Sequence, residues 1–115
     1  MADRPHLIAE LDPELATAAR DLARRLRESP RPRELKSEAA ELVVRLTIAG
    51  LESHFLRPVE RLGLGFVALS TVRLGLKTSG QGVGVLVRRI FDGMDDEKLR
   101  GVADTLSATV VDLEE

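Results

Sequence analysis

Residues 57–91 have the sequence RPVERLGLGFVALSTVRLGLKTSGQGVGVLVRRIF, and this stretch decides the fold. It carries one acid, Glu60, and six bases, while most of its other residues are apolar or glycine. A helix that is apolar on nearly every side is buried on more than one side. We therefore expect the central segment 46–91 to form the core of the domain, and the helices near 46–76 to form an interface between chains.

Proline and glycine divide this segment into predicted helices. Pro58 favours the start of a helix over 58–77, with a kink in one continuous rod as the alternative. The Gly-rich residues 78–82 predict a break, followed by a short helix over 82–91. Apolar residues also alternate on both sides of this break, so a β-hairpin near 71–90, in an α+β fold, is the alternative to an all-helical chain.

The N-terminal helix has the clearest signals in the chain. Asp12 is a capping residue, Pro13 suits the first helical position, and Glu14 is favourable beside the helix dipole. The helix should end near Glu28, because the prolines in 29–32 cannot continue it. Its apolar stripe consists of Leu15, Ala18, Ala19, Leu22, Ala23 and Leu26.

Two further amphipathic helices complete the prediction, one over 33–56 and one that begins after the capping residue Asp95. Their apolar stripes consist of Leu35, Ala39, Leu42, Val43, Leu46 and Ala49, and of Leu99, Val102, Ala103, Leu106, Val110 and Leu113. The predicted fold class is therefore all-α, a compact bundle of four to five helices. It forms a single domain over 1–115, with 1–11 as a flexible or loosely packed N-terminal tail.

The composition excludes several classes of site. The 115 residues include no Cys, Tyr or Trp, which rules out disulfides, thiolate metal sites and a cysteine nucleophile. Pockets that stack sugars or bases on aromatic rings are disfavoured, since Phe is the only aromatic residue type. With no targeting signal and no apolar run of the ~20 residues that a membrane span needs, we expect a cytoplasmic protein. The preference for Arg over Lys is typical of a GC-rich bacterial genome.

The net charge of −2 conceals blocks of opposite sign. Residues 20–36 carry seven bases against three acids, 57–91 carry six bases against one acid, and 92–115 carry eight acids against two bases. Blocks that pack together and screen each other explain this pattern, and the acidic overall balance favours that interpretation. The alternative is that the basic blocks bind anions. The candidate anion-binding residues are Arg20, Arg24, Arg27, Arg73, Lys77, Arg88 and Arg89.

No motif in the chain specifies catalysis. The run GQGVG over 80–84 lacks both the G-x-G-x-x-G spacing and the preceding strand of a dinucleotide-binding loop, so a flexible turn or close helix packing explains it. His54 has no partner at metal-ligand spacing. The acids lie at helix starts and on polar stripes, where capping and solubility explain them. We therefore predict no catalytic, metal-binding or cofactor-binding residue, and no cofactor.

These observations favour a non-enzymatic interaction module with a scaffold or regulatory role. We expect a homodimer or higher oligomer that also binds another protein through an apolar helical surface. The candidate interface residues are Leu46, Ile48, Leu51, Phe55, Phe66, Leu69 and Val72. The alternatives are binding of an anionic membrane surface or nucleic acid through the basic segments 20–36 and 57–89, and an enzyme or small-molecule site between helices or chains.

Overall fold

The computed structural model of the chain describes residues 8–110, and every regular element in that range is helical. The α-helices are α1 (Pro13–Glu28), α2 (Lys36–Leu51), α3 (Arg57–Leu62), α4 (Phe66–Asp92) and α5 (Asp96–Thr109). A π-helical turn, Glu52–Leu56, joins α2 to α3 without a break, so the described residues form four helical rods. The predicted all-α class is confirmed. The α+β alternative is wrong, because 71–90 lies entirely within α4.

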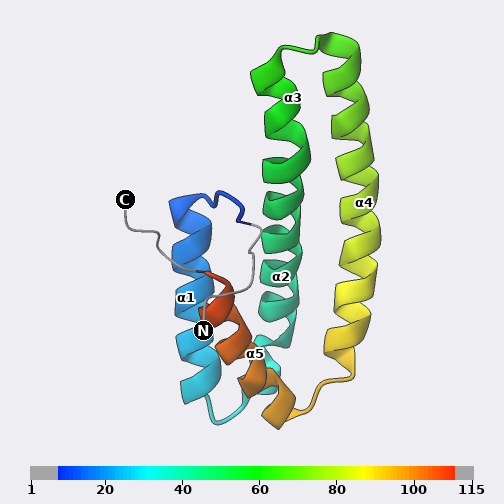
Figure 1. Cartoon of the computed structure of the whole chain (residues 1–115). Coiled ribbons are helices and arrows are strands. Elements are labelled where there is room, and N and C mark those ends of the chain that lie inside the picture. Colours follow the sequence, from blue (N-terminus) through cyan, green and yellow to red (C-terminus); the bar gives the residue numbers. More distant parts are fainter. Residues whose placement is uncertain (1–7, 111–115) are drawn as a thin grey trace, which may run out of the picture.

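The helices form two pairs (Figure 1). α2 packs mainly against α4, and α1 packs mainly against α5. The α2–α3 rod and α4 make a long helical hairpin, and its α3 end projects beyond α1 and α5. The molecule measures 51 × 35 × 26 Å and has a radius of gyration of 16.0 Å, against about 13 Å for a compact domain of this size. The predicted helical bundle is confirmed with four helices, but it is elongated rather than compact, because half of the hairpin has no other described element beside it (Figure 1).

The core lies between α1, α5 and the first half of α2. Its buried side chains are Leu15, Ala19, Leu22, Ala23, Leu26, Ala39, Ala40, Leu42, Phe91, Leu99, Ala103, Leu106 and Val110. Only Phe91 comes from the segment 46–91, so the prediction that this segment forms the core is wrong. The physical reason is that α1 and α5 bury their apolar stripes against each other and against α2, which leaves no helix within residues 8–110 to cover the outside of α4.

The outer helices begin as their sequences predict. Asp12 Oδ1 accepts a hydrogen bond from the Glu14 amide at 3.3 Å, and Asp95 Oδ1 accepts one from the Lys98 amide at 2.9 Å. These side chains satisfy amide groups that have no partner inside the helix. α1 ends where Ser29 adopts an extended conformation, with φ −70° and ψ 132°, as expected for a residue before proline. The predicted helix 13–28 is confirmed.

Pro58 does not start a new helix. The rod continues through it, and the π-helical turn before it lets the Arg57 amide donate to the Glu52 carbonyl, five residues back. Proline has no amide hydrogen, and its ring crowds the carbonyl four residues earlier, here that of His54. The wider turn accommodates this crowding, so a distorted continuous rod replaces the separate helix predicted over 58–77.

The chain reverses at Gly63-Leu64-Gly65 rather than at 78–82. Gly63 and Gly65 have φ angles of +61° and +95°, a region that glycine enters without steric cost. The amides of Gly63 and Leu64 donate to the carbonyls of Glu60 and Val59 at 3.2 and 3.5 Å, which closes the end of α3 as in a Schellman motif. The predicted break at 78–82 is wrong, because α4 passes through these residues unbroken.

An ion-pair cluster ties α1 to α2. Arg25 donates from Nε to Asp21 Oδ2 at 2.8 Å and from Nη1 to Glu38 Oε1 at 3.1 Å. Hydrogen bonds from Arg24 and then Arg25 lower the pKa of Asp21 below its ordinary value of 3.8. The hydrogen bonds from Arg25 lower the pKa of Glu38 below its ordinary value of 4.5.

Among the residues described, no helix is both long enough and apolar enough to cross a membrane.

Glu38→Gln should lower stability in a pH-dependent way. Folding lowers the pKa of this carboxyl. Its stabilising effect is therefore fully present at a pH above its ordinary pKa of 4.5, and is lost as the pH falls through the pKa of the folded state. At neutral pH we expect a loss of about 0.2–1 kcal/mol, as for an exposed ion pair. Urea unfolding at pH 7 and pH 3 measures the difference, which should be smaller at the lower pH. Glu60→Gln, at an exposed site without an ion pair, is the control; an equal loss there would contradict the assignment.

Leu99→Ala should destabilise the fold strongly. Leu99 is 0% exposed in the core between α1 and α5, and truncating a buried leucine costs about 2–5 kcal/mol. Leu74→Ala is the matched control, since Leu74 is 67% exposed on α4. Urea unfolding at low protein concentration should show little change for the control, and a comparable loss in both variants would contradict this placement of the core.

Candidate functional site

The described surface concentrates its exposed apolar side chains on the hairpin. Ten large hydrophobic residues are exposed, and nine of them lie between residues 55 and 90. These nine are Phe55, Leu62, Leu64, Phe66, Val67, Leu74, Val85, Leu86 and Ile90. Single exposed hydrophobic residues are ordinary, whereas a contiguous set marks an interaction surface. The uncovered hairpin is therefore the candidate functional site.

One part of this site runs along α4 on the side away from α2. We call it the outer face of α4. It consists of exposed residues spaced three and four apart, namely Val67, Thr71, Leu74, Gly75, Thr78, Ser79, Gly82, Val85 and Leu86. The face contains no charged side chain, and its middle is built from small residues around Ser79. Another helix could therefore approach the backbone of α4 closely at that point.

A second part is the end of the hairpin. We call Leu62, Leu64, Phe66 and Val67 the apolar tip; their exposed fractions are 71%, 57%, 82% and 78%. They surround the glycine turn between α3 and α4, at the end of the molecule farthest from α5 (Figure 1). Nothing in the described part of the chain covers them.

A groove of about 670 Å³ lies between α2 and α4. Gly80 and Gly84 are buried there, and Ile48 packs against Gly80 so closely that an added Cβ would lie 3.2 Å from its Cδ1. The absence of side chains at these glycines opens the groove. Its lining residues are Val44, Ile48, Glu52, Arg73, Leu76, Lys77, Gly80, Gln81, Gly84, Val85 and Arg88.

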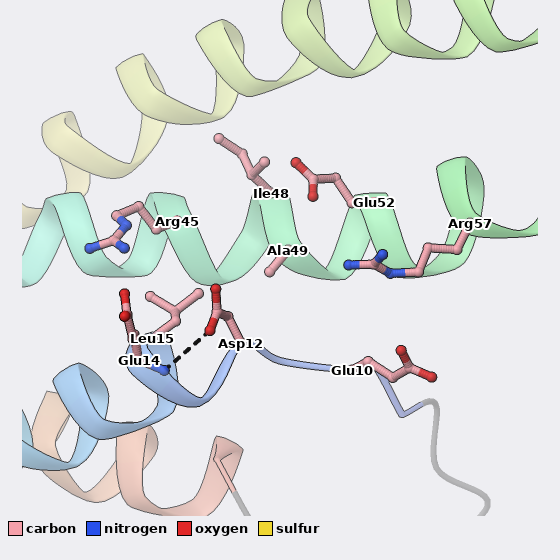
Figure 2. Close-up of a pocket in the computed structure, with 9 residues that line it drawn as sticks. All are labelled: Glu10, Asp12, Glu14, Leu15, Arg45, Ile48, Ala49, Glu52 and Arg57. Carbon is pink, nitrogen blue, oxygen red and sulfur yellow. Dashed lines mark hydrogen bonds between the residues drawn. The ribbon is translucent and has the colours of Figure 1, made fainter. Parts of the chain in front are cut away.

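A charged cleft of about 300 Å³ lies between the start of α1 and the rod (Figure 2). Figure 2 shows Asp12 and Glu14 pointing toward the rod, along which Arg45 and Arg57 lie. The remaining lining residues are Glu10, Leu15, Ile48, Ala49 and Glu52. Asp12 already caps α1. Within residues 8–110, no group of three or more His, Asp or Glu side chains is placed to hold a metal ion.

The predicted interface residues fall into two groups. Phe55 and Phe66 are exposed, at 58% and 82%. The other five are half-buried, and Leu46 packs against the core while Ile48 packs on Gly80. These five are Leu46, Ile48, Leu51, Leu69 and Val72. Because these five side chains are half-buried, they are not the most exposed ones. The exposed apolar surface therefore consists mostly of other residues of the hairpin.

The predicted anion-binding residues separate by helix. On α1, Arg24 pairs with Asp21 at 2.6 Å and Arg27 pairs with Asp104 at 3.2 Å, so acids of the fold already engage them. Arg20 lies exposed on the same helix. None of these three lines the hairpin groove, so the structure does not bring the two sets together there.

The basic residues on α4 form fewer ion pairs. Arg88 pairs with Glu41 of α2 at 3.0 Å. Arg73, Lys77 and Arg89 have no hydrogen bond or ion pair with any residue in the described range. Arg73 and Lys77 line the groove together with Arg88, and they flank the outer face of α4 without lying on it.

The sequence prediction missed Val67, Leu74, Val85 and Leu86 as surface residues. A continuous helical projection of 66–92 would have found them, because they lie on one side at spacings of three and four. The break predicted over 78–82 prevented that projection. Comparison with protein-family models, with curated proteins and with solved structures finds no match for this chain.

Gly80→Ala and Gly101→Ala should differ in their effect on stability. In a helix, alanine is favoured over glycine by about 1 kcal/mol, and a Cβ at Gly101 of α5 meets nothing within 4 Å. At Gly80 it meets Ile48 Cδ1 at 3.2 Å, which offsets the gain. Thermal unfolding should therefore show a higher midpoint for Gly101→Ala than for Gly80→Ala. Equal gains would contradict the close approach of α2 and α4.

Proposed function

We propose that the chain is a self-associating interaction module whose protomers dock through the outer face of α4. The observation that carries this proposal is the uncovered state of that face, from Val67 to Leu86. Within residues 8–110, α2 packs against the other side of α4, and α1 packs mainly against α5. Burying this face removes apolar surface from water, the dominant favourable term in most protein association.

The chemistry of the face favours a second copy as its occupant. A neutral face with small residues at its middle requires a partner helix that is also neutral and closely approachable. The same face of another protomer meets both conditions, and two-fold assemblies use one patch on both subunits. Arg73 and Lys77 stay on the flank, so the contact buries no charge, which would be costly. The uncharged part of the face spans 20 residues of α4, or about 30 Å of helix.

This arrangement suits a scaffold or regulatory role. Two hairpins joined through α4 would give a bundle at the centre of the assembly, with an α1–α5 pair on each outer side. The charged surfaces of α1 and α5 would then remain available to further partners. The same apolar face could also receive an amphipathic helix of another protein, in the way that helices dock into apolar grooves.

The double variant Gly75→Gln/Gly82→Gln should convert the protein into a monomer. Both glycines lie on the outer face, and a Cβ at either meets nothing within 4 Å in the protomer. Glutamine is a better helix former than glycine, so the fold should gain stability while the two protomers can no longer approach closely. Light scattering after size-exclusion chromatography, at tens of micromolar protein, measures the mass.

Gly101→Gln is the matched control, since it places the same side chain at an open glycine position on α5. The wild type and this control should be dimers or larger, and the double variant should have the mass of one chain. A wild type that is strictly monomeric at this concentration overturns the proposal. A double variant that remains as large as the wild type also overturns it.

A further inference from the structure

The apolar tip and the outer face of α4 have different shapes. The outer face is long and flat, whereas the tip is the convex end of a hairpin. Its four side chains project around a turn that Gly63 and Gly65 hold at positive φ. A protein partner would need a concave pocket of matching shape to bury such an end. A lipid bilayer adapts to a convex apolar tip, because acyl chains and headgroups rearrange around it.

The charged residues beside the tip are mostly basic, so they favour a negatively charged membrane surface. Arg61 is adjacent to Leu62, Arg57 lies five residues before Leu62, and Arg73 lies seven residues after Phe66. At 1.5 Å per residue, Arg57 and Arg73 stand about 8–10 Å behind the tip. An apolar face that enters the interface by about 5–10 Å would bring these bases to the level of the phosphates.

Acids are few on the hairpin end but not absent, since Arg57 lines the charged cleft together with Glu10, Asp12, Glu14 and Glu52. Glu60 is the only acid from 57 to 91. Arg57 and Arg73 have no ion-pair partner in the described range, and Arg61 has only the exposed carboxylate of Glu10 at 3.4 Å. The basic residues of α1, by contrast, are matched by acids of the fold. Two of the bases without an ion pair in the described range, Arg57 and Arg73, therefore lie near the most exposed apolar side chains, while Lys77 and Arg89 lie farther along α4.

We propose that the apolar tip inserts into the interface of an anionic lipid membrane, with Arg57, Arg61 and Arg73 against the lipid phosphates. Nucleic acid would use the same charges but gains nothing from Leu64 and Phe66, so the observations favour the membrane. This inference does not rest on self-association, because the tip belongs to one protomer.

The chain has no tryptophan, so Phe66→Trp introduces a single fluorescent reporter at the tip. Vesicles of phosphatidylcholine that contain phosphatidylglycerol should shift its emission to the blue, and vesicles of phosphatidylcholine alone should shift it much less. Thr17→Trp places the same reporter at an exposed site on α1 and should show no shift. Raising the salt concentration should weaken the response, because the attraction is screened.

Vesicle co-sedimentation with Leu64→Ser/Phe66→Ser tests the apolar contribution. Both residues are exposed, so the fold should be unaffected while binding to phosphatidylglycerol vesicles falls at least about tenfold. Val85→Ser/Leu86→Ser removes two exposed apolar side chains from the outer face and should keep vesicle binding. Arg57→Gln should reduce the affinity by about fivefold.

Three results would overturn the inference: no binding to phosphatidylglycerol vesicles at low salt, binding that survives Leu64→Ser/Phe66→Ser, or binding lost in the outer-face variant instead. Salt-sensitive binding to duplex DNA, with no blue shift on vesicles, would assign the bases to nucleic acid and also overturn it. A protein that is monomeric yet binds vesicles through the tip would support this inference and contradict only the proposed self-association.

Discussion

The mutual burial of α1 and α5 governs the rest of the structure. Leu22 and Leu26 of α1 and Leu99 of α5 are at most 1% exposed, and together with the first half of α2 they close the core. Because these stripes bury each other, the described part of the chain has no further helix with which to cover α4. The long hairpin therefore keeps a two-helix cross-section along its outer half, and its apolar residues face solvent.

Glycine has two separate roles in this hairpin. Gly63 and Gly65 supply the positive φ angles that reverse the chain, and Gly80 lets α2 approach α4 closely through Ile48. A Cβ added at Gly75 or at Gly82 would meet nothing within 4 Å. Each of these two glycines lowers helix stability relative to alanine, and no close packing within the protomer compensates for this loss. Both glycines lie in the middle of the outer face. If another helix packs there, its close approach explains why glycine is used in spite of the lower helix stability.

The two basic blocks of the sequence have different fates in the structure. The block over 20–36 is neutralised inside the fold, since Arg25 meets Glu38, Arg27 meets Asp104 and Arg33 meets Asp96. The block over 57–91 is only partly neutralised, chiefly by the pair between Arg88 and Glu41. The screening interpretation therefore holds for the block over 20–36, and the sequence could not say which block would be paired, because pairing depends on which helices become neighbours.

The sequence by itself determined the helical class and the bounds of α1, because caps, prolines and apolar spacing act within a few residues. It also identified 46–91 as too apolar for ordinary surface. Only the tertiary structure decided where the chain turns and which apolar residues face out. Gly63–Gly65 and 78–82 are both glycine-rich, and the choice between them depends on whether α4 can pack along α2. That packing is a long-range contact, and local propensity does not contain it.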